Sequence, residues 1–174
     1  MSDARGEMRG LLRTMTAAIF IAAAAAAAAQ TKLVDTFNDW YFYSHEGSNE
    51  RVCFAASAPQ SSEPAGVSRD PAYFYISAWP KEGVRTELSV KIGYPFREGS
   101  EAKVTIGNET FTMFTHEDRA FVNNPIEELK LLEAMKRGST MVVEGVTEQG
   151  TSTRDTFSLL GVTKAVQTLT SQCG

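Results

Sequence analysis

Alternating apolar and polar residues along much of the chain predict a β-rich fold. The clearest alternation covers residues 86–92, where Leu88, Val90 and Ile92 are apolar and the residues between them are polar. A period of two places one face of a strand in the core and the other in solvent. Similar patterns, or short apolar runs between turn residues, predict further strands over residues 40–44, 51–56, 72–78, 102–106, 109–114, 141–146 and 153–159.

One segment shows helical periodicity instead, with signals at both ends. Asn124 is a favourable N-cap, Pro125 suits the first helical position, and Gly138 is typical of a helix end. We therefore predict a helix over residues 125–137. Its apolar stripe is formed by Leu129, Leu132 and Met135. The tail, residues 162–172, predicts a second short helix. Its apolar face contains Val162, Ala165, Val166 and Leu169.

The first 29 residues have the organisation of a secretory signal peptide. Arg5, Arg9 and Arg13 precede an unbroken apolar stretch over residues 17–29. This stretch is shorter than the roughly 20 residues of a membrane-spanning helix, and it ends in small residues that suit a cleavage site. We predict cleavage after Ala29, which would leave an exported chain without a membrane span.

Removal of this leader would leave 145 of the 174 residues, enough for one domain with a substantial core. Residues 30–38 show little periodicity and are predicted to be a tether, followed by a single domain over residues 39–174. The leader holds three of the chain's 17 basic residues and two of its 21 acidic residues, so 14 and 19 would remain. A net charge near −5 argues against nonspecific binding to nucleic acids or anionic lipids, because both rely on clustered lysine and arginine.

Both cysteines, Cys53 and Cys173, lie in the exported part. Two cysteines in an oxidising compartment are most simply one disulfide, although two buried free thiols are an alternative. The two histidines, His45 and His116, are far apart, and neither a Cys-x-x-Cys nor a His-x-x-x-His spacing occurs. We therefore predict a Cys53–Cys173 disulfide, no metal site and no cofactor.

A succession of short strands with one or two short helices is typical of a β-sandwich or a partly open barrel. We favour a mostly β, immunoglobulin-like β-sandwich. The cysteine spacing differs from that of an antibody domain, so the predicted disulfide would join the sheet to the C-terminal tail rather than one sheet to the other.

Several short segments, in their order and spacing, make the chain similar to a known family. They are Cys53-Phe54-Ala55-Ala56-Ser57, Arg69-Asp70-Pro71-Ala72-Tyr73, Trp79-Pro80, Gly93-Tyr94-Pro95-Phe96, Ala134-Met135-Lys136, Gly150-Thr151-Ser152-Thr153, Phe157-Ser158-Leu159 and the final cysteine. From about Trp40 to Cys173 the chain resembles the invasion-associated locus B family of exported bacterial proteins. The resemblance implies an immunoglobulin-like sandwich and a periplasmic or secreted location. The family name comes from host-cell invasion, and the resemblance supplies no catalytic site.

Aromatic residues supply the candidate binding surface, because tyrosine and tryptophan are enriched at binding hot spots. The candidate partner-binding surface comprises Arg69, Tyr73, Tyr75, Trp79 and Tyr94. The alternative places these aromatics in the core with their hydroxyls at its rim. On that alternative Asp70 pairs with Arg69 or with backbone amides, and the segment has a structural role.

Catalytic residues are not evident in the sequence. His116 and Asp118 lie two positions apart, but no nucleophile elbow or hydrolase signature surrounds them, and a polar loop explains them better. The favoured hypothesis is a noncatalytic envelope module that binds a protein partner in the envelope or on a host cell. The alternatives are a structural or stress-related periplasmic protein without a host partner, and an enzyme with an unrecognised site.

Overall fold

The computed structural model describes residues 30–47 and 50–173, which form mostly antiparallel β-structure with two α-helices. The predicted signal peptide and its cleavage site at Ala29 lie outside the described residues. The strands are β1 (Gln30–Phe37), β2 (Trp40–Glu46), β3 (Arg51–Ser57), β4 (Ser61–Glu63), β5 (Tyr73–Trp79), β6 (Val84–Lys91), β7 (Glu101–Ile106), β8 (Glu109–His116), β9 (Arg119–Phe121), β10 (Thr140–Val146) and β11 (Ser152–Ser158). The helices are a 3-10 turn, η1 (Pro80–Glu82), followed by α1 (Pro125–Arg137) and α2 (Val162–Cys173).

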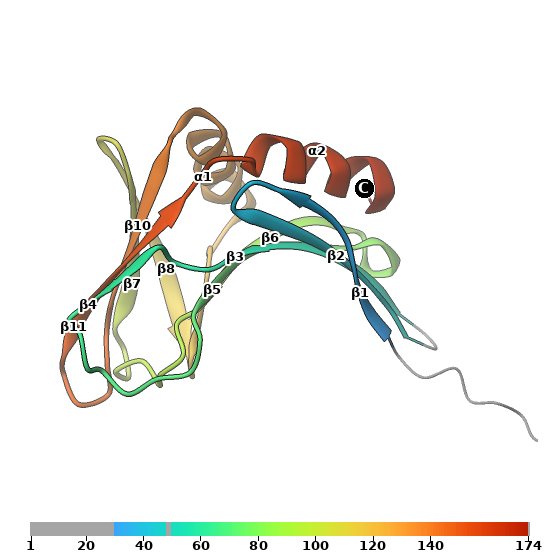
Figure 1. Cartoon of the computed structure of the whole chain (residues 1–174). Helices are drawn as coiled ribbons and strands as arrows, with labels where there is room; N and C mark the ends of the chain where they lie inside the picture. The colour runs from blue at the N-terminus through green and yellow to red at the C-terminus, as the bar shows by residue number, and fades with distance from the viewer. Residues whose placement is uncertain (1–29, 48–49, 174) are drawn as a thin grey trace, which may run out of the picture.

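All of these strands belong to one sheet that bends back on itself. Their order is β1-β2-β3-β5-β6-β9-β8-β7-β10-β11-β4, and short β9 carries the hydrogen-bond ladder from β6 to β8. Figure 1 shows one arm formed by β2, β3, β5 and β6 and a second arm formed by β7, β10 and β11. This confirms the predicted mostly β fold with two helices.

Contacts between strands that are distant in the sheet show that the inner faces of the two arms meet. The Trp40 indole N–H on β2 donates to the Ser158 carbonyl oxygen on β11, at 3.1 Å. The Phe74 ring on β5 packs edge to face on Phe157 of β11, with ring centroids 6.2 Å apart. The core therefore lies between the arms, as in a β-sandwich.

The predicted tether over residues 30–38 is wrong, because residues 30–37 form strand β1. This strand pairs antiparallel with β2 from Gln30↔Glu46 to Phe37↔Trp40, across a turn in which Asn38 has a positive φ of 52°. The side chains of β1 are almost all exposed. An edge strand without a buried face has no apolar alternation to reveal it, and here backbone pairing supplies the order.

Helix α1 begins as predicted, and two of the three residues of its predicted apolar stripe, Leu132 and Met135, are buried. The Asn124 side chain accepts hydrogen bonds from the backbone N–H groups of Ile126 and Glu127, at 3.1 and 2.9 Å. Leu129, predicted to face the sheet, is 61% exposed. The buried residues are Leu131, Leu132, Ala134 and Met135. The buried face of α1, which contacts β6 and β8, therefore includes two neighbouring leucines, which a stripe formed by every third residue does not contain.

Helix α2 packs across β2, β3 and β5 and is joined covalently to the sheet. Its predicted apolar face is buried, as is Cys173. The structure links Cys173 to Cys53 on β3 by a disulfide, with Cα atoms 6.1 Å apart, as predicted. Neither described helix is long and apolar enough to cross a membrane.

Candidate functional site

The five residues of the predicted binding surface divide between two places in the structure. Tyr73, Tyr75 and Trp79 belong to β5, where Tyr73 and Tyr75 lie on the sheet face that points away from α2 and the core. Arg69 and Tyr94 instead lie in a mostly buried polar network between the two arms. The binding surface predicted from the sequence therefore contains residues of an outer sheet face together with residues of the interior.

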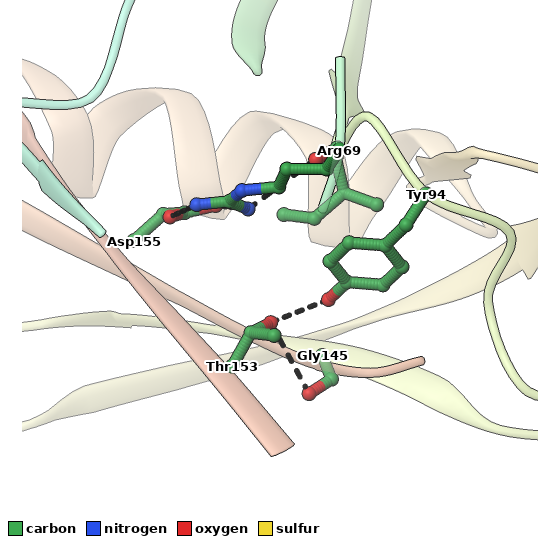
Figure 2. Close-up of polar contacts among 6 residues, drawn as sticks. Arg69, Tyr94, Gly145, Thr153 and Asp155 are labelled. Atoms are coloured by element: carbon green, nitrogen blue, oxygen red, sulfur yellow. Dashed lines mark hydrogen bonds and ion pairs between the residues drawn. The ribbon is translucent and has the colours of Figure 1, made fainter. Parts of the chain in front are cut away.

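Arg69 holds the long loop before β5 against the opposite arm (Figure 2). Its guanidinium forms a bidentate ion pair with Asp155 of β11, in which Nη1 donates to Oδ2 at 2.7 Å and Nη2 donates to Oδ1. Nη1 also donates to the Ile92 carbonyl oxygen at 3.3 Å. The Asp155 side chain has no exposed surface, and the hydrogen bond to it raises the pKa of Arg69. Asp155, and not the predicted Asp70, is the partner of Arg69.

Tyr94 extends the same network and is only 5% exposed. Its hydroxyl hydrogen-bonds to the Thr153 hydroxyl, and Thr153 is also within 3.4 Å of the Gly145 carbonyl oxygen, as Figure 2 shows. The Tyr94 ring packs edge to face on Phe96 and lies 5.9 Å from the Arg69 guanidinium carbon. Burial raises the pKa of Tyr94. Arg69 and Tyr94 thus join the arms and are not part of an exposed surface.

The arm formed by β2, β3, β5 and β6 carries a row of aromatic rings on its outer face. The register of β2, β3 and β5 aligns alternate residues of these strands. Tyr43 lies opposite Phe54, and the two rings stack with centroids 5.0 Å apart. Phe54 packs against Tyr75 at 6.0 Å, and Tyr75 lies 6.0 Å from Tyr73, which is 37% exposed. We call Tyr43, Phe54, Tyr75 and Tyr73 the aromatic row.

A shallow groove of about 560 Å³ crosses this outer face. We call it the outer groove. Its apolar lining consists of Val52, Phe54, Tyr75, Trp79 and Phe121. Its polar lining consists of Thr31, His45, Glu50, Ser77, Glu87, Ser89 and Arg119. These residues come from β1, β2, β3, β5, β6 and β9, together with Glu50 of the β2–β3 turn. The volume falls within the range of small-molecule sites, about 300–1,000 Å³.

Charged groups lie towards both ends of the outer groove. Near β1, the His45 ring accepts from or donates to the Thr31 hydroxyl at 2.8 Å, and its Nε2 lies 3.5 Å from a Glu50 carboxylate oxygen. Near β9, the Arg119 guanidinium carbon lies 5.6 Å from the centroid of the Tyr75 ring. Burial raises the pKa of Glu87, and the positive charge of Arg119 opposes that increase.

Trp79 contributes an unusual polar atom to this region. Its indole Nε1 is buried and has no hydrogen-bond partner among the described residues. A buried donor without a partner costs about 1–3 kcal/mol.

Of the five residues that the sequence proposed for binding, two line the outer groove, Tyr75 and Trp79. Phe54 and Phe121 lie in short apolar runs that gave no sign of their outward orientation. Glu87 and Ser89 alternate with core residues and were predicted to be solvated. Ser89 is instead 2% exposed, because it lies between Tyr75 and Phe121, its partners on the two neighbouring strands. The missing information was the register that aligns the strands.

The two residues considered for catalysis have other surroundings. The Asp118 carboxylate lies 3.6 Å from the Lys91 ammonium group, and His116 lies at the end of β8 opposite Arg119 of β9. Over residues 30–47 and 50–173, no group of three or more histidine, cysteine, aspartate or glutamate residues is arranged to hold a metal ion.

Comparisons with known proteins place the chain in a family. Residues 40–170 match the model of the invasion associated locus B (IalB) protein family. Among solved structures, invasion associated protein b from Bartonella henselae superposes with a TM-score of 0.57 at 12% identity, covering 80% of this chain and 97% of that one. No curated protein sequence matches. The structural likeness supports the fold, and the family match covers most of the sequence. The chain belongs to the invasion associated locus B family.

Proposed function

We propose that this protein is an exported, noncatalytic binding module of the cell envelope that contributes to host-cell invasion. Family membership supports the link to invasion. The disulfide between Cys53 and Cys173 supports export, because such bonds persist in oxidising compartments. The basic and apolar leader of the sequence agrees with a periplasmic or secreted location.

The outer groove is the observation that carries the binding role. Its aromatic rings occupy outward positions, so they contribute little to the core between the two arms. Tyrosine and tryptophan supply large contact areas at a small cost in side-chain entropy. A groove of this kind, edged by charged side chains, has the composition of a recognition site rather than of a solvated sheet face.

One arrangement of side chains in the structure favours the catalytic alternative. Thr31, His45 and Glu50 form a hydroxyl–imidazole–carboxylate sequence that resembles the order of a nucleophilic relay. The imidazole and carboxylate atoms are 3.5 Å apart, beyond the roughly 2.6–3.2 Å of a catalytic hydrogen bond, and the Glu50 side chain is largely exposed. We therefore expect no His45-dependent turnover in a hydrolase screen of wild type and His45→Ala.

Binding of the fluorescently labelled, purified protein to cultured host cells tests the proposal. We expect Tyr75→Ala and Arg119→Ala to weaken binding by about tenfold or more, as loss of a hot-spot contact does. The control is Ile126→Ala, because Ile126 is 68% exposed but lies on α1 and does not line the groove. Equal binding by all three variants and wild type would refute a binding role for the groove.

Export is tested separately by fractionation and mass spectrometry of the protein made in its own cells. The expected species is recovered from the periplasm or the medium and begins at Gln30. A stable envelope species that still contains Arg5 to Arg13 would show that the leader is an uncleaved anchor.

A further inference from the structure

The outer groove crosses strands rather than following one. In sheet order its lining passes from β1 through β2, β3, β5 and β6 to β9. Neighbouring strands are about 4.8 Å apart, so lining residues from six successive strands span about 24 Å along the sheet. An elongated ligand, or an elongated part of one, would fill the groove.

Such a ligand must be recognised by side chains. The backbone N–H and C=O groups of the strands under the groove are paired with neighbouring strands along the ladders. An extended peptide would bring its own backbone donors and acceptors at every residue, and a sheet face offers none to match them. This argues against the strand-addition mode of peptide recognition, which requires a free sheet edge.

The outer groove carries charged groups of both signs. Glu87 faces the positive charge of Arg119 at one end, and His45 lies next to Glu50 at the other. A polyanionic ligand would meet both carboxylates, and a polycationic ligand would meet Arg119. The arrangement is complementary to an uncharged ligand that hydrogen-bonds strongly.

The remaining groups suit a ligand rich in hydroxyls. Arg119 offers only donors, and Glu87 offers acceptors when ionised. The rings of Phe54 and Tyr75 have electron-rich faces, which attract the C–H groups on the flat faces of sugar rings.

We propose that the outer groove binds a neutral oligosaccharide chain displayed on the host-cell surface. This inference rests on the proposed binding function and specifies the chemistry of its ligand. An alternation of apolar C–H faces and uncharged hydroxyls along an extended chain matches the aromatic residues, the mixed donors and acceptors, and the charges of both signs in the groove.

Direct titration is the first test. The purified protein is titrated with maltohexaose, cellohexaose and chitohexaose, and with a heparin hexasaccharide as a polyanion, using calorimetry and intrinsic fluorescence. The chain has two tryptophans, and Trp40 is fully buried, so a fluorescence change on binding would report Trp79. We expect at least one neutral hexasaccharide to bind. Failure of all three at millimolar concentration, or tighter binding of the heparin fragment, would overturn the proposal.

Variants decide whether that binding uses the groove. Tyr75→Ala and Glu87→Ala should each weaken it by about tenfold or more, whereas Ile126→Ala should leave it unchanged. Trp79→Phe keeps an aromatic ring but removes the indole fluorophore, so it should abolish the fluorescence change without abolishing binding. Thermal unfolding of each variant checks its fold. If Tyr75→Ala does not fold, Arg119→Ala replaces it in the assay, because Arg119 is exposed and its substitution disturbs the fold less. Unchanged affinity in folded Tyr75→Ala, or in its replacement Arg119→Ala, and in Glu87→Ala would contradict the inference.

A binding assay on treated host cells distinguishes failure of this inference from failure of the proposed function. Host cells are treated with mild periodate, which cleaves the vicinal diols of sugars, before the binding assay. Loss of groove-dependent binding supports an oligosaccharide ligand. Groove-dependent binding that survives both periodate and glycosidases, which remove sugar chains without vicinal diols, identifies a protein surface as the ligand and overturns the inference while the binding function stands. Stronger groove-dependent binding to polysaccharide from the bacterium's own envelope would overturn the host-cell source.

Discussion

The Arg69–Asp155 pair shows how one side-chain contact can hold two distant parts of the chain together. The Asp155 carboxylate is fully buried, and both of its oxygens accept hydrogen bonds from the Arg69 guanidinium. A buried ion pair adds little net stability compared with apolar residues of the same volume, because desolvation opposes the attraction. Removal of one partner is a different matter, because it leaves a buried charge unpaired.

We therefore predict that Arg69→Ala lowers the free energy of unfolding by about 3–5 kcal/mol. The matched control is Lys130→Ala, which breaks the exposed Lys130–Glu127 pair at 2.8 Å and should cost about 1 kcal/mol or less. Urea denaturation at neutral pH measures both. Similar losses in the two variants would show that Asp155 is satisfied by other groups when Arg69 is absent.

Glu128 gives the fold a dependence on pH. Burial raises the pKa of Glu128 from 4.5 to about 7, and the nearby negative charge of Glu87 adds to the effect. Because the folded state holds this proton more tightly than the unfolded state, the associated stability is fully present below about pH 4.5. It is lost as the pH rises through about 7.

We predict that Glu128→Gln is more stable than wild type at pH 8 and close to it at pH 5. The side chain is only partly buried, so solvent screening limits the difference to about 1 kcal/mol. Denaturant unfolding at the two pH values measures it, with Glu98→Gln as an exposed carboxylate control. A wild type and a Glu128→Gln variant with parallel pH profiles would contradict this prediction.

At the scale of elements, the sequence predicted the strands and helices that bury one face. Apolar and polar residues alternate over residues 86–92, which form most of β6 although Ser89 is also buried, and Asn124 with Pro125 marked the start of α1 to the residue. Strand β1 was missed because its order comes from pairing with β2 and not from a buried face. The α1 stripe was partly wrong because Leu129, Leu131 and Leu132 lie within four residues, and several rotations of the helix would bury two of them.

The structure turns that ambiguity into a paired prediction. Leu132 is 5% exposed and belongs to the core, whereas Leu129 is 61% exposed. Leu132→Ala should lower the free energy of unfolding by about 2–5 kcal/mol. Leu129→Ala, the same chemical change one turn earlier in the helix at an exposed position, should cost less than about 0.5 kcal/mol. Chemical denaturation of the two variants tests the rotation of α1, and similar losses in both would show that the helix packs as the sequence pattern predicted, with Leu129 and Leu132 both buried.

At the scale of the molecule, the candidate site depends on register that a single sequence does not contain. Phe54, Tyr75, Glu87 and Arg119 come from four strands, and only their pairing brings them to one groove. The sequence could identify aromatic residues such as Tyr94 as candidates. It could not show that the Tyr94 hydroxyl points to Thr153 inside the molecule, because that contact joins residues from the two arms.

The Cys53–Cys173 disulfide constrains the whole chain, because it closes a loop with a sequence separation of 120 residues. It fastens α2 to β3, although the buried apolar face of α2 already holds the helix against the sheet. Chain-entropy arguments give such a link about 4–5 kcal/mol as an upper figure, since a compact unfolded state reduces the gain.

We predict that reduction of the native protein lowers its free energy of unfolding by about 2–4 kcal/mol and leaves it folded. Comparison of oxidised and reduced wild type in guanidinium isolates the covalent constraint, because the side-chain atoms are otherwise the same. A Cys53→Ala, Cys173→Ala double variant should lose slightly more, since Cys53 is fully buried and its replacement removes core contacts. The unfolding of the oxidised protein should also show the smaller dependence on denaturant, because its unfolded chain stays more compact. Identical curves for oxidised and reduced protein would mean that the packing of α2 alone fixes the C-terminus, and that the disulfide adds no measurable stability.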